Sequence, residues 1–528
     1  MIRSENYTDN KSSFVRWMKN LTEPVTQDLR SAIWKKRDGV ELSRAEVREY
    51  FLDYVPMQGP GYSEHMMERE QQNLEKLLLP WSVRPAWAEW GPNRVEGYYD
   101  KRQWTGRLST LSDDIASFRK RFPIQAEPLP IRKAWHRLPS ATSSGLPWLQ
   151  SQWKEKIGAS IASEVQDKWK RDSPGEIPPS MPMWRVDPGP KVRLAWAESK
   201  YEALYGAPFV YPVADRLREF DKSPFIAWKG PDDTAASISQ HMKKGNCDEY
   251  LSVDYASYDQ TQAPELVRRV WNELIHPMTG SRKPNVSSAW LENFTSGPLV
   301  TPEGLRTGDH GVPSGSVATN FVDSINNALC IEGYMSNYGI DDGRYWVQGD
   351  DALICGHNVE PKDFSEFAQS EYGFIAHPDK QYFGIREGDF LQNSYYVEND
   401  YLPTYPAARV AWRMIGHERF SYSPGDWNQW AVVVRAIQQL QNAYHHPYIN
   451  DLVRWAGNGD KLRLGADEAP RDVMRMAGKA GYHMVQERAR WDLGAEDRNW
   501  DVLPIQRIIR AELADTVLSG RARLLAQT

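Results

Sequence analysis

The sequence predicts an α+β fold, with its strands gathered in one region and helices dominating the C-terminal end. The strongest strand and hairpin signals lie in residues 246–400, whereas helical periodicity dominates from about residue 401 onward. Residues 1–140 mix short helical patterns with loops rich in Pro and Trp, which favours a segment that wraps a core built elsewhere. At roughly 150 residues per domain, 528 residues correspond to about three or four domains.

Composition excludes several classes of protein. Hydrophobic residues make up 41% and charged residues 25%, which excludes a wholly disordered chain. Only 3 Cys are present, so a disulfide scaffold is excluded and a reducing compartment is expected. No run of about 18 apolar residues occurs, so we expect no membrane span. Because the net charge is -6, a nucleic-acid site must be a local positive channel.

The first acidic pattern lies in residues 250–259. Tyr250–Asp254 reads as a short strand that ends at Asp254, and Asp259 follows in a predicted loop. Pro264 then opens a predicted helix. Two Asp residues at this spacing arise readily by chance, so a loop with capping carboxylates is an equal interpretation of this pattern alone.

A Pro-Ser-Gly loop leads into the next predicted helix. Ser314 and Gly315 lie in the loop, and Thr319, Asp323 and Asn327 follow at four-residue spacing, which places them on one helix face. Taken alone, a capped surface helix explains this polar stripe equally well.

The third pattern is a predicted hairpin over residues 344–355. Two apolar runs flank Gly349-Asp350, a dipeptide suited to a tight turn, so Asp350 and Asp351 would stand at the hairpin tip. A solvated acidic turn on the surface is the alternative.

Order and combination separate these interpretations, since the three patterns follow one another within about a hundred residues and their chance frequencies multiply. Together they resemble motifs A, B and C of the palm of viral RNA-dependent RNA polymerases. The details are most similar to the picobirnavirus and partitivirus type, including Asp323 where many plus-strand virus polymerases have Asn. This resemblance implies a closed right-hand fold with a small antiparallel palm sheet and a helical thumb.

The resemblance also implies a division of the chain into subdomains. The expected ranges are an N-terminal extension bridging fingers and thumb (1–60), fingers (61–245 and 266–305), palm (246–265 and 306–400) and thumb (401–528).

Nucleotidyl transfer in this family uses two divalent cations held by carboxylates. The resemblance assigns Asp254 and Asp350 as principal ligands of two Mg²⁺ or Mn²⁺ ions and Asp351 as the auxiliary ligand. Converging carboxylates would otherwise repel and raise one another's pKa. The family's network that senses the ribose 2′-hydroxyl would comprise Asp259, Ser314, Gly315, Thr319 and Asp323. Asp323 can only accept hydrogen bonds when ionised, whereas Asn could also donate them.

Four further stretches resemble family motifs. A loop at the template entrance would contain Thr142, Ser143, Ser144 and Gly145, although an ordinary turn explains it too. Lys191 and Arg193 alternate along an extended segment and would cover the incoming triphosphate, the alternative being a solvated edge strand. Lys380 would protonate the leaving pyrophosphate, unless it is simply a surface Lys. Residues 390–396 would form a hairpin that grips the primer strand.

Zinc and other chemistries have weaker support. Cys355 with His357, or His445 with His446, lacks a four-ligand spacing, so we expect structural histidines. No phosphate-binding P-loop of the Gly-x₄-Gly-Lys-Ser/Thr type occurs.

The resemblance therefore implies template-directed RNA synthesis for a double-stranded RNA virus. The expected partners are RNA template and product, nucleoside triphosphates and a viral capsid protein, with the virion interior or host cytoplasm as location. Two other readings stay open. A reverse transcriptase shares the palm but excludes the 2′-hydroxyl with an aromatic residue, and a non-catalytic RNA-binding inner-capsid protein would not need Asp350.

Overall fold

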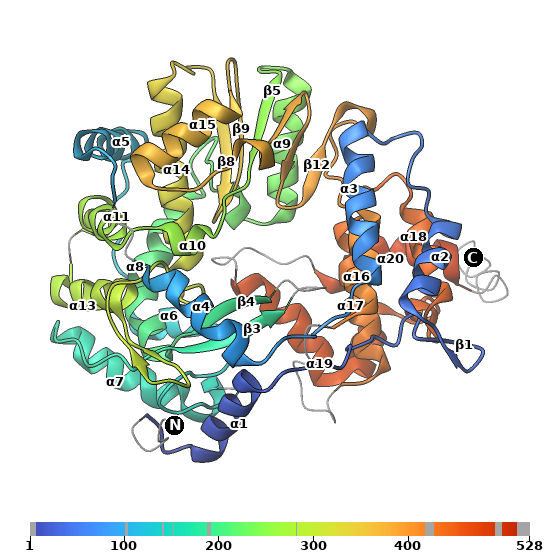
Figure 1. The fold of residues 1–528 in the computed structure, drawn as a ribbon, viewed down its shortest axis with the longest axis horizontal. Coiled ribbons are helices and arrows are strands. Elements are labelled where there is room, and N and C mark those ends of the chain that lie inside the picture. Colours follow the sequence, from blue (N-terminus) through green and yellow to red (C-terminus); the bar gives the residue numbers. More distant parts are fainter. Residues whose placement is uncertain are drawn as a thin grey trace, which may run out of the picture.

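The computed structural model describes residues 7–100, 104–139, 142–151, 153–186, 192–280, 282–417, 427–491 and 499–514. Three parts surround the centre of the molecule in Figure 1. A sheet with its helices lies at the top, a mixed region with many helices lies at the lower left, and a second helical region lies at the right.

The described part of the chain contains one four-stranded antiparallel sheet, in the order β10-β5-β9-β8. The predicted hairpin is confirmed, because β8 and β9 are adjacent and joined by the turn at Gly349-Asp350. Its strands are β5 (Glu249–Val253), β8 (Arg344–Gln348), β9 (Asp351–Gly356) and β10 (Tyr382–Ile385).

Alternation along the strands gives the sheet two different faces. Leu251, Val253 and Ile354 lie in the large core, which also contains the apolar residues of α14 (Thr319–Asn337). Tyr250, Leu353 and Trp346 belong to a separate small core, together with apolar residues of α9 (Pro231–Lys244) and of a hairpin, β11 (Gly388–Phe390) and β12 (Asn393–Tyr395). The sheet is therefore covered by α14 on one side and by α9 and the hairpin on the other.

The region at the lower left carries the β3–β4 hairpin and most helices of the first 300 residues (Figure 1). The large core continues through it along α8, which is almost wholly buried. Its elements are α1 (Lys11–Thr22), α4 (Trp87–Tyr99), α6 (Ile131–Arg137), α7 (Ala159–Lys170), β3 (Met181–Val186), β4 (Val192–Ala197), α8 (Lys200–Leu217), α10 (Tyr258–Thr261), α11 (Pro264–Val270), α12 (His276–Met278), α13 (Pro284–Ser296), β6 (Leu299–Val300) and β7 (Leu305–Arg306). Helix α5 (Leu108–Arg121) lies beside α14, and α15 (Pro361–Phe367) lies beside the sheet.

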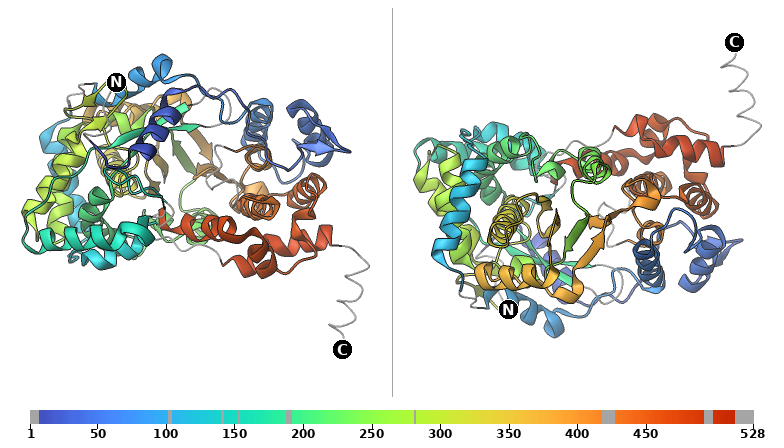
Figure 2. Two further views of the ribbon diagram at one scale, coloured as in Figure 1. Left: turned by 90° about the horizontal axis from the view of Figure 1, so that it is seen from below. Right: turned by 90° about the horizontal axis from the view of Figure 1, so that it is seen from above.

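The helical region at the right combines residues 33–81 with the C-terminal helices. Figure 2 shows the helices of residues 44–74 beside the C-terminal ones from below and from above. One core contains Phe51, Leu77 and Trp81 from the N-terminal part together with Trp412 and Trp455. The elements are β1 (Lys36–Arg37), β2 (Val40–Glu41), α2 (Arg44–Tyr54), α3 (Glu64–Leu74), α16 (Ala407–Ile415), α17 (Gln429–Asn442), α18 (Ile449–Asn458), α19 (Pro470–Trp491) and α20 (Ile505–Leu513).

Helix α3 is fixed to this region by a buried carboxylate. Glu70 accepts hydrogen bonds from the backbone N–H groups of Ala407 (2.7 Å) and Ala408 (2.9 Å), and so caps the N-terminus of α16. His446 Nε2 lies 2.9 Å from the same carboxylate. Residues 64–74, which we expected to group with the rest of 61–245, thus pack on the C-terminal helices.

Two local predictions were wrong. Residues 172–190 were expected to be an extended loop, but β3 begins at Met181 and pairs with β4. Asp259 was expected in a loop, yet it lies in the short helix α10. In contrast, Pro264 opens α11 as predicted. The hairpin expected over residues 390–396 is found as β11–β12 over residues 388–395, with Leu391 and Gln392 both at positive φ in its turn.

Within the described residues, none of the helices combines the length and apolar character that a bilayer crossing requires.

Candidate active site

Strand register brings the predicted acidic residues together. Val253 of β5 lies opposite Ala352 of β9, so the next position along β5, Asp254, lies opposite Asp351. Neighbouring strands are about 4.8 Å apart, and Asp350 occupies the turn beside this pair. Three carboxylates separated widely in the sequence therefore meet at one end of the sheet.

The tip of the hairpin is held from behind by α14. The Gly349 N–H donates to Ser324 Oγ (2.7 Å), and Asn327 Nδ2 donates to the carbonyls of Gly349 (3.0 Å) and Asp350 (3.4 Å). Asn327 Oδ1 in turn accepts from the Tyr255 hydroxyl (3.0 Å). The helix thus fixes the turn that presents Asp350.

The carboxylates of Asp254, Asp350 and Asp351 repel one another. Burial, together with the nearby Asp254 carboxylate, raises the pKa of Asp350, and Arg193 partly opposes this. The pKa of Asp351 is raised to about 7 by burial and then by Asp350 and Asp254. Arg409 and Arg69 act in the opposite direction on Asp351. Negative charge is therefore concentrated beyond what the side chains of the site neutralise.

Asp259 and Asp323 form a second acidic pair behind the first group. Burial raises the pKa of Asp259 to about 7, and Asp350 adds to the shift. Burial, followed by the Asp259 charge, raises the pKa of Asp323 well above its usual value. A protonated Asp323 that donates to an ionised Asp259 fits both shifts, since the bond lowers the pKa of Asp259 and raises that of Asp323. Asp323 can thus donate a hydrogen bond, as an Asn would.

Gln262 orients this pair. Its Nε2 donates to Asp323 Oδ1, and its Oε1 accepts from Asn326 Nδ2 (2.5 Å). The Tyr258 hydroxyl donates to the backbone carbonyl of Asp323 (3.2 Å). The pair therefore has a fixed geometry.

The loop before α14 is closely packed. A Cβ on Gly315 would lie 1.7 Å from the backbone oxygen of Trp196, so no other residue fits there. Thr319 donates its hydroxyl to the carbonyl of Pro313 (2.6 Å), within the loop itself. Ser314 Oγ lies 3.5 Å from the Tyr98 hydroxyl. Thr319 thus shapes the loop, whereas Ser314 has only a long contact.

Basic residues approach the acidic group from other elements. Arg193 is an exposed residue of β4, and its charge acts on both Asp259 and Asp350. Lys191 lies outside the described residues. Lys380 is exposed at the end of a 3₁₀ turn (Pro378–Lys380). The next residue, Gln381, accepts from the Asp254 N–H (3.0 Å) and donates to the Asp254 carbonyl (2.8 Å), which places Lys380 close to this end of the sheet.

The predicted template loop is ordered mainly by its own hydrogen bonds. Ser144 is buried, its Oγ accepts from the Gln150 N–H (3.0 Å), and the Gly145 N–H donates to Ser143 Oγ (3.2 Å). Gly145 has a φ of +65°. Thr142 Oγ1 is buried without a hydrogen-bond partner, and only Ser143 of the four residues is exposed. No described contact joins this loop to the acidic group.

Several residues that hold the site have no distinctive sequence signal. Gln262, Ser324 and Gln381 act on Asp323, the turn and Asp254 respectively, but each is an ordinary polar residue in its local pattern. For Asn327, the four-residue spacing with Thr319 and Asp323 did indicate a shared helix face. That spacing did not reveal that Asn327 bonds the turn at Gly349-Asp350.

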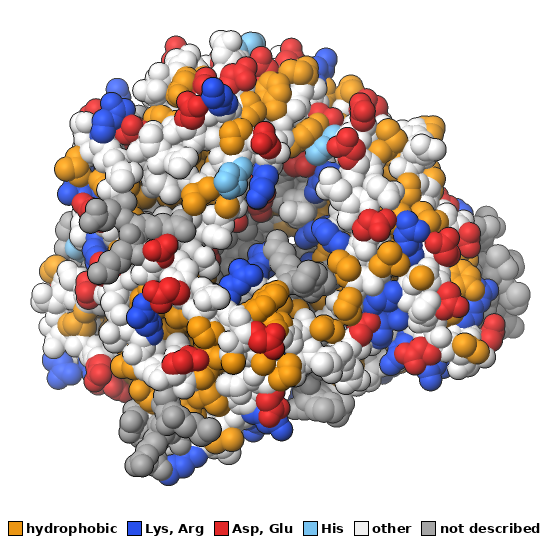
Figure 3. Space-filling model, viewed as in Figure 1, with side chains coloured by type: hydrophobic (Ala, Val, Ile, Leu, Met, Phe, Trp, Pro, Cys, Tyr) orange, Lys and Arg blue, Asp and Glu red, His pale blue; other side chains and the backbone are white. Residues whose placement is uncertain are grey.

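The donor set suits a hard divalent cation. Figure 3 shows a hollow at the centre of one face, with acidic and basic side chains on its walls. Asp254 and Asp350 are exposed to solvent although the surrounding protein raises the pKa of Asp350. Accessible carboxylate oxygens with unneutralised charge are the ligands that Mg²⁺ and Mn²⁺ prefer.

The histidines considered earlier for zinc have other partners. His357 is exposed and pairs with Asp342, and His446 is buried beside Glu70. Neither forms a metal site with the residue first considered.

Comparison with known proteins gives one family. A model of the viral RNA-dependent RNA polymerase family matches residues 120–426. A protein of human picobirnavirus (strain Human/Thailand/Hy005102/-), described as a potential RNA-dependent RNA polymerase, is 26% identical over 306 residues. That match covers 52% of this chain and 56% of the relative, so the chain spans about half the length of the curated relative it matches.

Solved structures share the fold. The crystal structure of the RNA-dependent RNA polymerase of a human picobirnavirus gives a TM-score of 0.76, covers 96% of this chain and 98% of that one, and is 16% identical. An insertion-loop deletion mutant gives 0.75, with 93% and 98% covered and 17% identity. The family match extends over more than half of the chain and includes Asp254, Ser314 and Asp350; the protein belongs to the viral RNA-dependent RNA polymerase family.

Proposed function

We propose that this protein synthesises RNA on an RNA template by two-metal nucleotidyl transfer and replicates and transcribes a double-stranded RNA genome. The observation that carries the proposal is the register of the sheet, which sets Asp254 opposite Asp351 with Asp350 at the adjoining turn. The family supports the same chemistry.

In this proposal, Asp254 and Asp350 hold two Mg²⁺ or Mn²⁺ ions and Asp351 assists. The bound ions would lower the pKa of the primer 3′-hydroxyl and neutralise the triphosphate. Arg193, with Lys191, would orient the phosphates of the incoming nucleotide. Lys380, at the edge of the site, would deliver a proton to the pyrophosphate as it leaves.

Ribose selection would depend on the Asp259–Asp323 pair and the loop with Ser314, Gly315 and Thr319. Thr319 is used within its loop, so its part would be to hold Ser314 and Gly315 in place. A hydrogen-bonding pair at this point would favour ribonucleotides. Comparing the incorporation of nucleoside triphosphates with that of deoxynucleotides distinguishes this function from reverse transcription.

The remaining assignments are also proposals. The sheet region would be the palm, the lower-left region the fingers and the helical region at the right the thumb, with the template entering past Thr142–Gly145. We further propose a capsid protein as partner, and the virion interior or host cytoplasm as the place of action.

The Asp350→Asn variant tests the proposal. It keeps the shape of the turn but removes a charged ligand, so nucleotide addition should fall about 1000-fold or more while RNA binding and the melting temperature stay near wild type. The control is Asp341→Asn, an exposed acidic residue in the turn before β8.

Normal RNA synthesis by Asp350→Asn would remove the two-metal proposal. Loss of RNA binding in this variant but not in the control would instead favour a non-catalytic RNA-binding protein.

A further inference from the structure

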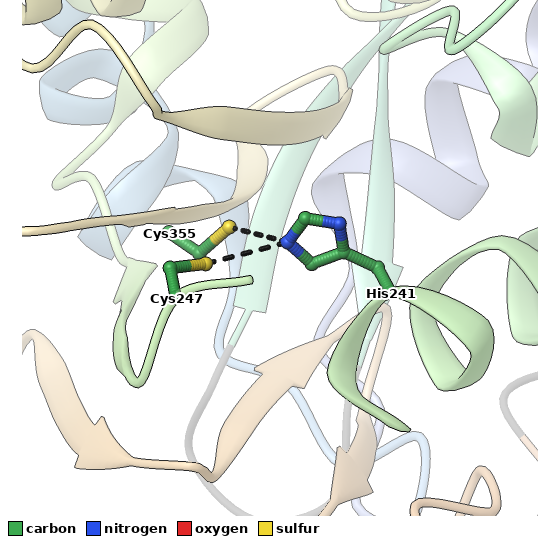
Figure 4. Close-up of side chains that lie close together, drawn as sticks. All are labelled: His241, Cys247 and Cys355. Carbon is green, nitrogen blue, oxygen red and sulfur yellow. Dashed lines mark hydrogen bonds between the residues drawn. The ribbon is translucent and has the colours of Figure 1, made fainter. Parts of the chain in front are cut away.

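A second group of metal-ligating side chains lies in the small core between the sheet and α9. His241 lies near the end of α9, Cys247 in the connection to β5, and Cys355 in β9 (Figure 4). His241 Nε2 lies 3.0 Å from Cys355 Sγ and 3.3 Å from Cys247 Sγ, and the three ligand atoms lie within 4.8 Å of one another. Three elements thus converge on one point.

This cluster is closed to solvent. The exposed fractions are 6% for His241, 2% for Cys247 and 0% for Cys355. Ile238, Met242, Trp346, Leu353 and Phe390 belong to the same small core. Such surroundings exclude competing water and favour a site that stays occupied.

The spacing of the ligand atoms is close to that of a tetrahedral zinc site. With Zn–S about 2.3 Å and Zn–N about 2.0 Å, tetrahedral angles separate nitrogen and sulfur by about 3.5 Å. The distances of 3.0 and 3.3 Å fall short of this value by a few tenths of an ångström. Small side-chain rotations would make room for the ion.

The sulfur atoms would bind the ion as thiolates, which is the form of Cys that binds metal. Each thiol would release its proton as the ion binds.

We propose that His241, Cys247 and Cys355 bind one structural Zn²⁺ ion. Thiolate and imidazole ligands select zinc over Mg²⁺ or Mn²⁺. An oxygen ligand would complete the tetrahedron, and the Tyr250 hydroxyl, 3.8 Å from Cys247 Sγ, would supply it.

The ion would join the C-terminal end of α9 to β9 and to the start of β5. Tyr250 pairs with Cys355 and Asp254 lies opposite Asp351, so the zinc site lies four residues, about 13 Å, along the same strands. The same alternation places Cys355 and Asp351 on one face of the sheet. The ion would therefore brace the two strands that present the acidic group.

Elemental analysis of the purified protein tests the proposal. Wild type grown with zinc should carry about one zinc per chain after gel filtration. The zinc content of Cys247→Ser and of Cys355→Ser should be at least about tenfold lower. Cys330→Ser is the matched control, because Cys330 is equally buried but lies on α14, outside the cluster. Asp350→Asn should also keep its zinc, which separates this site from the one for nucleotidyl transfer.

A Co²⁺ titration of the wild-type protein tests the site without relying on Cys variants, which could fail to fold. After removal of bound metal, wild type and Cys330→Ser titrated with Co²⁺ alone should develop a thiolate-to-cobalt charge-transfer band that saturates at about one equivalent. Absence of zinc in wild type together with absence of this band would overturn the proposal. Intact mass under non-reducing conditions that shows a Cys247–Cys355 disulfide in the purified protein would overturn it too.

Discussion

The two ends of one sheet face collect different ligands. At one end, Asp254, Asp350 and Asp351 offer oxygen atoms, and Asp254 and Asp350 are exposed. At the other end, Cys355, with Cys247 and His241, offers sulfur and nitrogen atoms inside an apolar core. An ion that must meet a substrate needs an open coordination position, whereas a structural ion needs a closed one. Exposure and donor chemistry change together along these strands, which supports different uses of the two ends.

Removing one basic side chain near each end of the sheet should give the largest difference in the rate of nucleotide addition. Lys380→Ala should slow single-turnover nucleotide addition about 100-fold with little change in template affinity, because the proposed general acid is lost. Arg344→Ala should change the rate less than about twofold, since Arg344 lies near Cys355, over the Trp346 ring, and its guanidinium bonds Ser237. If rapid-quench assays show that the two variants lower the single-turnover rate equally, the catalytic role does not belong to the oxygen end alone.

A smaller effect is expected from the support of the turn. Asn327→Ala removes two hydrogen bonds to the backbone at Gly349-Asp350 and takes from the Tyr255 hydroxyl its oxygen acceptor. The Mg²⁺ concentration for half-maximal activity should rise about tenfold, and unfolding free energy should fall by about 1–3 kcal/mol. Asn337→Ala, at the exposed end of α14, is the control. An unchanged Mg²⁺ requirement with lowered stability would make Asn327 purely structural.

The smallest expected effect is the share of the pH dependence that comes from the oxygen end, since burial also raises the pKa of Glu198, Glu202 and Asp114 elsewhere. The pKa values of Asp259 and Asp351 are raised to about 7, above the value of about 3.9 expected in the unfolded chain. Between these values the folded state binds more protons, so the stability of the metal-free protein falls as pH rises from about 4 to 7.

In the presence of a chelator, the melting temperature should therefore fall by a few degrees between pH 5.5 and 8. Adding Mg²⁺ should raise the melting temperature more at pH 8 than at pH 5.5. Asp351→Asn should weaken both trends, and the remainder would come from Asp259 and the other buried carboxyl groups. A Mg²⁺ effect independent of pH would show that protons and cations do not compete there.

Sequence reasoning succeeded where local patterns and order carried the information. The position of β5 to within one residue, the hairpin turn at Gly349-Asp350 and the start of α14 follow from alternation, turn chemistry and helical spacing. The register of the paired strands β5 and β9 then brings Asp254 and Asp351 together. Lys191 stays a prediction, since it lies outside the described residues.

Contacts between distant elements could not be predicted in this way. His241 and Cys247 showed no metal spacing because their third partner, Cys355, is more than a hundred residues away and meets them only through strand pairing. Gln262 and Gln381 act through side chains whose partners the sequence does not reveal. The alternation along β3 was likewise hidden by the Pro-rich composition of residues 172–190.

Helix α3 has a mechanical consequence. On one side Glu70 binds two backbone donors of α16, and on the other Arg69 donates to Asp389 of β11 and to Ser394 of β12. Hydrogen bonds to charged groups are worth about 1.5–3 kcal/mol each. Any increase in the distance between the sheet and the C-terminal helices must therefore carry α3 along with one side and break its hydrogen bonds to the other. The hydrogen bonds of this one helix thus oppose a change in the spacing of these two parts of the molecule.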